Sequence, residues 1–213
     1  MESNLSALDL TQLAALAAAL GFGSGMRLYA VVFLTGAAGA LGWVPLPPGL
    51  ALLQHPIVLT VAGVLVALEF FADKIPALDS VWDAVHTFIR IPAGAALAAA
   101  AFGGDHATWA VVAGLLGGTL AATAHTAKAS TRAAVNTSPE PFSNLGLSLL
   151  GDVSVPALLW LAFEHPLWFF AALALALMLA VTLILLTFKF VRALWRRLSG
   201  READPQPMPA LPR

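Results

Sequence analysis

An uninterrupted apolar stretch near the end of the chain limits what this protein can fold into. Residues 166–188 contain no ionisable side chain, and about 20 apolar residues in a helix are enough to cross the hydrocarbon layer of a membrane. Hydrophobic residues make up 59% of the chain and charged residues 11%, with a mean hydropathy of +0.83. A soluble domain is about 25% charged, because water must cover its surface. The sequence therefore predicts an integral membrane protein.

Five further apolar segments bring the expected number of spans to six. They cover residues 10–41, 52–72, 91–102, 108–124 and 145–163. The segment 91–102 would extend only about 18 Å as a helix, too short to cross alone. Either the amphipathic helix before it, residues 79–90, enters the membrane with it, or the two form a re-entrant hairpin broken at Pro92. A helix lying flat at the membrane interface is a third way to place residues 79–90. In each case we expect an all-α polytopic helix bundle.

Basic residues are distributed unequally about the six predicted spans. Ten of the eleven Lys and Arg residues would lie on one side, with Arg27 inside the first span. The positive-inside rule places that side in the cytoplasm. We therefore predict a multi-pass protein of the cell (inner or plasma) membrane with both termini cytoplasmic. The start, MESNLSALDL, lacks the basic residues of a secretory signal, so we expect it to be retained.

The chain divides into a short N-terminal segment (1–8), a transmembrane domain (9–189) and a tail (190–213). The tail begins as the basic, amphipathic KFVRALWRRL and ends in a Pro-rich stretch that we expect to be partly disordered. The segments LEFFADKIPAL and LSLLGDVSVPAL share the order Leu, Asp, Pro-Ala-Leu. They suggest halves 9–105 and 107–189, an inverted repeat of the kind found in many transporters. Chance similarity in an Ala- and Leu-rich chain is the alternative.

Ionisable side chains occur where membrane spans should contain few. Each costs about 2.5–3.5 kcal/mol on insertion scales, so such groups normally face a protein interior or an aqueous cavity. Two sets, spaced three or four residues apart, form single stripes on helices. The first stripe is Asp79, Asp83, His86 and Arg90, and the second is His125, Lys128, Arg132 and Asn136. Further candidates for the same polar path are Arg27, Glu69, Asp73, Lys74, Glu140, Asn144 and Asp152.

Opposite charges on different helices predict mutual pairing and leave three functions open. The first is a small transporter or channel for an unknown ion or small solute, with proton coupling through His86 or His125 as an option. The second is an intramembrane enzyme or binder for a phosphorylated lipid, with Lys128 and Arg132 holding the phosphate and Asp83 acting as base. The third is a structural or assembly protein in which the charges only hold helices together. The connector TSPEPFSN (137–144) is either an ordinary turn or the mouth of the cavity.

Several other kinds of chemistry are disfavoured. Glu69, Asp73, Asp79, Asp83 and His86 offer metal-ligand atoms, but basic residues surround them and no HExxH pattern is present. The absence of cysteine excludes disulfides and Cys-ligated clusters. No phosphate loop, dinucleotide fingerprint or GxSxG motif occurs, so enzyme activity is not favoured and no cofactor is expected. A net charge of −1 gives no field for nucleic acid. The lipid bilayer is the expected partner, and a homo-oligomer stays open.

Three segments carry a resemblance to a known family. LGFGSGMRLY, LEFFADKIPALDSVWDAVHTFIRIPAGA and HTAKASTRAAVNTSPEPFSN resemble a bacterial membrane family catalogued as domain of unknown function 4126, over about residues 10–190. The resemblance implies a multi-pass membrane protein and no particular activity. Within the first segment, GFGSG (21–25) predicts a helix break or a site of close helix packing.

Overall fold

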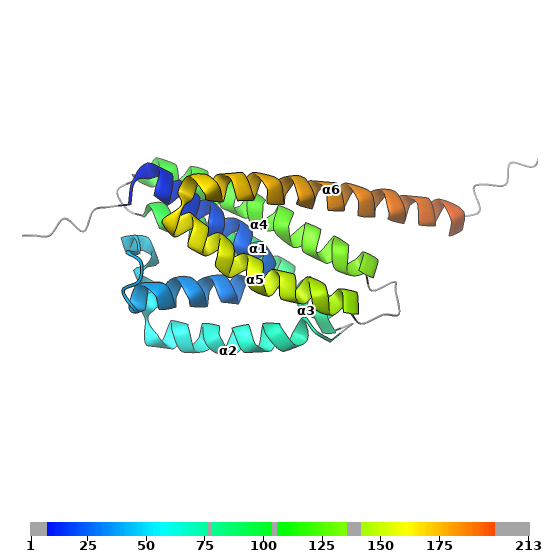
Figure 1. Ribbon diagram of the computed structural model, residues 1–213, viewed down its shortest axis with the longest axis horizontal. Coiled ribbons are helices and arrows are strands. Elements are labelled where there is room, and N and C mark those ends of the chain that lie inside the picture. The colour runs from blue at the N-terminus through cyan, green and yellow to red at the C-terminus, as the bar shows by residue number, and fades with distance from the viewer. Residues whose placement is uncertain (1–7, 76–77, 104–105, 136–141, 199–213) are drawn as a thin grey trace, which may run out of the picture.

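The structure is a computed structural model that describes residues 8–75, 78–103, 106–135 and 142–198. These residues form seven helices and the connections between them (Figure 1). The helices are α1 (Leu10–Ala40), the 3-10 helix η1 (Pro48–Gln54), α2 (Pro56–Ala72), α3 (Leu78–Phe102), α4 (Ala107–Val135), α5 (Phe142–Glu164) and α6 (Pro166–Leu198). No strand occurs in these residues, which confirms the all-α bundle. Five helices are long and apolar enough to cross a membrane, and η1 with α2, bent by 69°, would make a sixth.

The starts of several helices follow directly from local sequence. Asp9 and Gln12 form a capping box before α1, in which each side chain accepts a hydrogen bond from the backbone N–H of the other. Proline occupies the first position of η1, α2 and α6, where its missing N–H and fixed φ suit a helix. Helix α6 continues beyond the predicted domain end at residue 189 and carries the basic amphipathic stretch as helix.

The amphipathic stretch 79–90 and the apolar run after it form one helix. Helix α3 is unbroken from Leu78 to Phe102 with Pro92 in its interior, and residues 81–102 satisfy the length and hydropathy of a span. The polar stripe is buried in the bundle, with Asp79 and Arg90 fully inaccessible. Of the three alternatives, the hairpin broken at Pro92 and the flat interfacial helix are therefore wrong. Most of the stripe lies within the span-length segment, with Asp79 just before it.

Helix α1 is broken at Arg27, where φ −147° and ψ 82° leave the helical region. A β-carbon on Gly23 would lie 2.8 Å from Cγ2 of Val31, although eight residues of straight helix span about 12 Å. The chain therefore turns back on itself at Arg27, as the two blue segments of Figure 1 show. The packing of α1 against neighbouring helices supports this turn. Gly21 and Gly25 face Gly117 and Ala121 of α4 in the same order, which makes the first arm of α1 parallel to α4.

The second arm of α1 runs antiparallel to α2, since Phe33 lies beside Gly63 and Gly36 beside Leu59. Both ends of α1 consequently lie at one end of the bundle, and α6 ends at the other (Figure 1). We predicted that residues 10–41 cross the membrane once, with a helix break or a packing site at GFGSG. The helix is broken nearby, at Arg27, but the chain turns back there instead of crossing. The expectation that both termini share one side depended on that single crossing. The outermost residues, 1–7 and 199–213, are outside the described part of the chain.

Small residues let α1, α3 and α4 approach closely at the centre of the bundle. A β-carbon on Gly21 would lie 2.6 Å from Cα of Gly117, and one on Gly94 would lie 2.7 Å from Cβ of Ala121. Close backbone approach of this kind drives helix association in membranes, where there is no water to expel. The GFGSG run is thus both a packing site and the approach to the break.

Gly21→Ala is expected to lower the unfolding free energy by roughly 1–3 kcal/mol, because the added methyl group meets the backbone of α4 rather than a flexible side chain. Gly146→Ala, on α5, is the matched control, since nothing lies within 4 Å of its β-carbon position. Alanine favours helix by up to about 1 kcal/mol over glycine, so the control should be neutral or stabilised. Thermal melting in detergent measures both variants, and equal melting temperatures would contradict the packing argument.

Candidate functional site

A connected network of ion pairs occupies the interior of the bundle. Its salt bridges join five basic and five acidic side chains, so their formal charges sum to zero. The basic members are Arg27, Lys74, Arg90, Lys128 and Arg132, and the acidic members are Glu69, Asp73, Asp79, Asp83 and Asp152. These residues come from α1, α3, α4 and α5, from α2 and from the turn after it. The predicted mutual pairing of charges on different helices is confirmed.

The break in α1 places Arg27 at one side of this network. Its Nη2 lies 2.8 Å from Asp73 Oδ2 and 2.9 Å from Asp152 Oδ1, and it also donates to the carbonyl and hydroxyl oxygens of Ser148 on α5. Lys128 Nζ donates to the carbonyl of Met26 at 3.1 Å. A broken helix leaves carbonyl groups without their usual partners, so Lys128 satisfies one of the groups beside the break.

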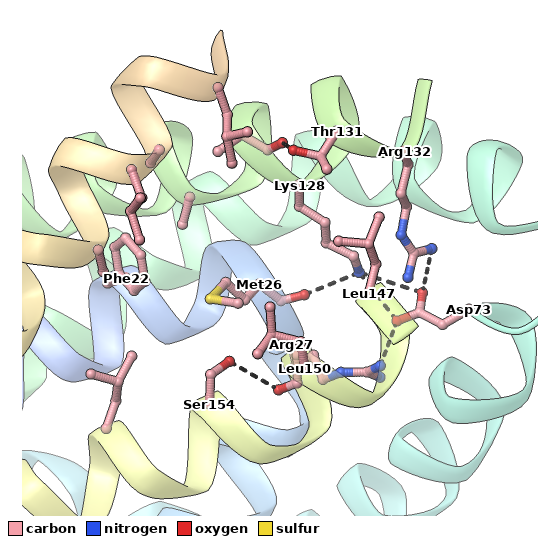
Figure 2. Close-up of a pocket in the computed structure, with 18 residues that line it drawn as sticks. Phe22, Met26, Arg27, Asp73, Lys128, Thr131, Arg132, Leu147, Leu150 and Ser154 are labelled. Carbon is pink, nitrogen blue, oxygen red and sulfur yellow. Dashed lines mark hydrogen bonds and ion pairs between the residues drawn. The ribbon is translucent and has the colours of Figure 1, made fainter. Parts of the chain in front are cut away.

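Asp73 is the carboxylate at which the cations converge. It ends α2, is fully buried, and lies 2.8 Å from Arg27, 3.3 Å from Lys128 and 3.0 Å from Arg132. Figure 2 shows these three side chains pointing toward it from α1 and α4. One carboxylate with three cations on it carries a local excess of positive charge, which the more distant acids of the network balance.

The other acids lie on α2, α3 and α5, and the two on α3, Asp79 and Asp83, face α4. Arg90, fully buried, pairs with Glu69 at 2.5 Å and with Asp83 at 2.7 Å. Asp83 lies 3.3 Å from Lys128, and Asp79 lies 3.4 Å from Arg132. The α3 stripe and the α4 stripe therefore face each other, as their helical spacing indicates. Lys74 and Asp152, 3.4 Å apart and each one-fifth exposed, form the outer edge of the network.

Two histidines adjoin the network, and their contacts define their tautomers. His86 Nδ1 lies 2.7 Å from the carbonyl of Trp82 and must donate to it, so in the neutral imidazole Nε2 accepts from the Tyr29 hydroxyl at 3.0 Å. In His125 the donor and acceptor nitrogens are exchanged. Arg90 Nη1 can only donate, so Nδ1 of His125 accepts at 3.3 Å, and Nε2 donates to the Thr87 hydroxyl at 2.7 Å.

Several buried polar atoms of the network lack a hydrogen-bond partner among the described residues. They are Nε of Arg27, Nε of Arg90, Oε2 of Glu69 and Oδ2 of Asp83, the last lying 3.8 Å from Arg132 Nη1 as an ion pair only. A charge removed from water and incompletely satisfied is costly. The network is therefore balanced in charge, but its hydrogen bonds do not fully offset the free energy of removing these charges from water.

A cavity of about 290 Å³ opens beside the network, between α1, α4, α5 and α6. Its polar lining is Arg27, Asp73, Lys128 and Arg132, with the hydroxyl groups of Thr131 and Ser154 (Figure 2). The remaining walls are mostly apolar: Phe22, Met26, Ala124, Ala127, Leu147, Leu150, Gly151, Leu158, Ala176, Leu179, Ala180 and Leu183. The cavity thus has one charged region and an apolar body.

The structure brings together most of the residues predicted from the sequence. The ten charged residues, with His86 and His125, form one network. Asn136 and Glu140 lie outside the described residues, and so does the side chain of Asn144. The proposed metal ligands do not assemble, because no group of three metal-binding side chains occurs in the described part of the chain, and basic residues separate them. The inverted repeat remains a prediction.

Sequence reasoning missed the uncharged members of the site. Ser148, Tyr29 and Thr87 bond to Arg27, His86 and His125, respectively. It also missed the apolar walls supplied by α5 and α6, because a leucine that lines a cavity looks like a leucine that faces lipid. The only available signal for Ser148 was its spacing of four residues from Asp152 on one helix face.

Comparison with known proteins adds a family and no activity. No curated protein and no solved structure matches the chain. The family model described as Domain of unknown function (DUF4126) matches residues 14–185, a range that includes every member of the ion-pair network. The chain is therefore a member of the DUF4126 family.

Proposed function

We propose that this protein is a small membrane transporter whose substrate path passes the break in α1. The observation that carries the proposal is Arg27, which occupies the break, lines the cavity and belongs to the ion-pair network at once. Discontinuous helices near the middle of the membrane form the substrate sites of many transporters, because broken helices present polar groups that a continuous helix keeps bonded.

A purely structural role accounts less well for the network. Buried ion pairs often contribute no net stability compared with apolar residues of similar size. Ten charged groups are more than six helices need for mutual orientation, and unpartnered atoms such as Glu69 Oε2 would serve no purpose in a mere support. A transport path explains both features, since a moving ligand needs charges of a particular sign at a particular depth.

Proton coupling, if the transporter uses it, is better assigned to His86 than to His125. A second proton on His125 would occupy Nδ1, which faces the Arg90 guanidinium. A second proton on His86 would occupy Nε2, which faces the Tyr29 hydroxyl, and a hydroxyl can accept as well as donate. The partner of His86 Nε2 can therefore either donate or accept, whereas the partner of His125 Nδ1 can only donate.

The orientation we propose follows from the turn in α1. Residues 1–26 and the connections 41–55 and 103–106 contain no Lys or Arg. The start of α1 and the connection from α1 to α2 lie at the end of the bundle opposite the end of α6 (Figure 1). Lys189, Arg192 and Arg196 lie near the end of α6. The positive-inside rule then places the end of α6 in the cytoplasm and the start of α1 outside the cell membrane.

Asp83→Asn and His86→Gln are expected to leave a folded, monodisperse protein and to abolish flux, because each keeps the size of the side chain and changes its charge or proton chemistry. Glu164→Gln and His165→Gln are the matched controls, since both residues are exposed, Glu164 at the end of α5 and His165 between α5 and α6. Proteoliposomes should be screened for the flux of protons, monovalent cations, divalent cations, phosphate and an alkyl phosphate. If the unmodified protein moves none of these, or the two site variants transport normally, the transport proposal is wrong.

A further inference from the structure

The cavity has the shape of a site for an amphiphile rather than for a hydrated ion. Its volume, about 290 Å³, is about ten times that of one liquid water molecule. Three cationic side chains and one carboxylate gather in one region, while leucine, alanine, methionine and phenylalanine form most of the remaining wall. A bare ion would leave these apolar walls without a purpose, whereas a molecule with a charged head and an apolar tail would fill both parts.

The charged region selects the sign of the head group. The lining side chains Arg27, Lys128 and Arg132 are positive and Asp73 is negative, so the lining itself carries a formal charge of +2, which Asp79, Asp83 and Asp152 balance from outside the lining. A phosphate monoester carries about −1.5 to −2 at pH 7, which matches this excess better than a carboxylate does. Two of the cations are arginines, whose planar guanidinium groups bind phosphate oxygens in pairs.

A buried hydrogen-bond donor remains available in this region. Nε of Arg27 has no hydrogen-bond partner among the described residues, and the Arg27 side chain is only 5% exposed. It lies 3.3 Å from the position that a β-carbon on Gly151 would take, and Gly151 itself lines the cavity. The absence of a side chain at Gly151 therefore leaves space beside this donor. Asp73 now holds the cations, and an incoming phosphate would compete with it.

The apolar part of the cavity reaches the outer surface of the bundle. Leu150, Leu179 and Leu183 line the cavity and are 65%, 56% and 39% exposed, respectively. They belong to α5 and α6, two of the helices that qualify as membrane spans, so their exposed surfaces face the lipid region. α5 and α6 diverge from the short connection between them toward the end of α6 (Figure 1). An alkyl chain can therefore extend between α5 and α6 into the bilayer while its head stays at the cations.

We propose that the cavity binds a phosphorylated amphiphile, with the phosphate at Arg27, Lys128 and Arg132 and the alkyl chain directed between α5 and α6. This inference rests on the proposed function in taking the cavity as the substrate site, and it names the substrate class. The same phosphate chemistry is present in a free phosphate ion and in a lipid head group, so the test must separate these two sources.

The test compares three ligands with the purified full chain in a neutral maltoside detergent. Dodecyl phosphate carries the head and the tail, inorganic phosphate carries the head alone, and dodecylphosphocholine carries the same tail on a zwitterionic head. Dodecyl phosphate is expected to raise the melting temperature in a saturable way, as a ligand of the folded state does, and the other two are not. Stabilisation by inorganic phosphate to the same extent would make the ligand a free anion, and equal stabilisation by dodecylphosphocholine would reduce the effect to detergent.

Two substitutions on α6 locate the binding. Ala176 lines the cavity, whereas Ala174 on the same helix is exposed and does not. Ala176→Phe should fill the cavity and weaken the binding of dodecyl phosphate by at least about tenfold, equivalent to about 1.4 kcal/mol, while Ala174→Phe should bind normally. Ser154→Phe, which fills the cavity from α5, provides the same comparison if Ala176→Phe does not fold. Unchanged binding in a folded cavity-filling variant would overturn the inference.

The outcome is distinguishable from that of the transport proposal. Saturable binding of dodecyl phosphate with no flux in proteoliposomes would support the amphiphile site and contradict the transport proposal. The opposite result is flux of another panel member that Asp83→Asn abolishes, together with no binding of dodecyl phosphate. It would support the transport proposal and contradict the amphiphile site.

Discussion

Arg90→Met is expected to lower the unfolding free energy by roughly 3–5 kcal/mol, the cost of removing one partner from a buried ion pair. Arg90 is fully inaccessible and pairs with Glu69 at 2.5 Å and Asp83 at 2.7 Å. Asp83 keeps Lys128 and Arg132 as partners. Glu69, 1% exposed, keeps no salt bridge that the described residues provide. The cost should therefore arise mainly from a carboxylate stranded in a medium without water.

A second substitution tests this origin. Glu69→Gln removes the stranded charge, so the double variant Arg90→Met, Glu69→Gln should recover part of the stability that Arg90→Met loses. Arg192→Met is the matched control, because Arg192 is exposed on α6 and exposed charges contribute about 0–1 kcal/mol. Thermal melting in detergent, or unfolding by a denaturing detergent, compares the four proteins. If Arg90→Met and Arg192→Met have the same melting temperature, the guanidinium of Arg90 is not a buried, paired cation.

Local periodicity was sufficient to predict the polar half of the site. Spacings of three and four residues place Asp79, Asp83, His86 and Arg90 on one face of α3 whatever the rest of the fold does. The high cost of isolated charges in a membrane then requires partners of opposite sign on other helices. These two arguments need no tertiary information, and the ion pairs between α3 and α4 confirm both.

The turn in α1 and the apolar half of the cavity lay beyond the same reasoning. Residues 10–41 have the length and hydropathy of a span, and neither property distinguishes a straight crossing from two arms that turn at Arg27. The turn depends on contacts from other helices, namely those of Asp73 and Asp152 with Arg27 and of Lys128 with Met26. Similarly, Leu150 and Leu179 line the cavity only because α5 and α6 diverge from each other beside α4 (Figure 1).

The turn in α1 leads to a result with an all-or-none readout. Because the chain has no cysteine, single-cysteine variants can be labelled in intact cells with a membrane-impermeant maleimide. We expect Leu10→Cys and Trp43→Cys, at the two ends of α1, to be labelled from the same side of the membrane. Both positions are well exposed, at 54% and 75%. Arg192→Cys, exposed near the end of α6, should react only after the cells are permeabilised.

The pattern of the three labels separates the two topologies. With a straight first span, Leu10 and Trp43 would lie on opposite sides and Leu10 would share the side of Arg192. With α1 turning back at Arg27, Leu10 and Trp43 share a side and Arg192 lies on the other. The relation between Leu10 and Trp43 depends only on the fold, whereas their assignment to the outside depends on the positive-inside rule. Labelling of Leu10→Cys and Trp43→Cys from different sides would therefore contradict the turn in α1. The transport proposal would then lose the observation on which it rests.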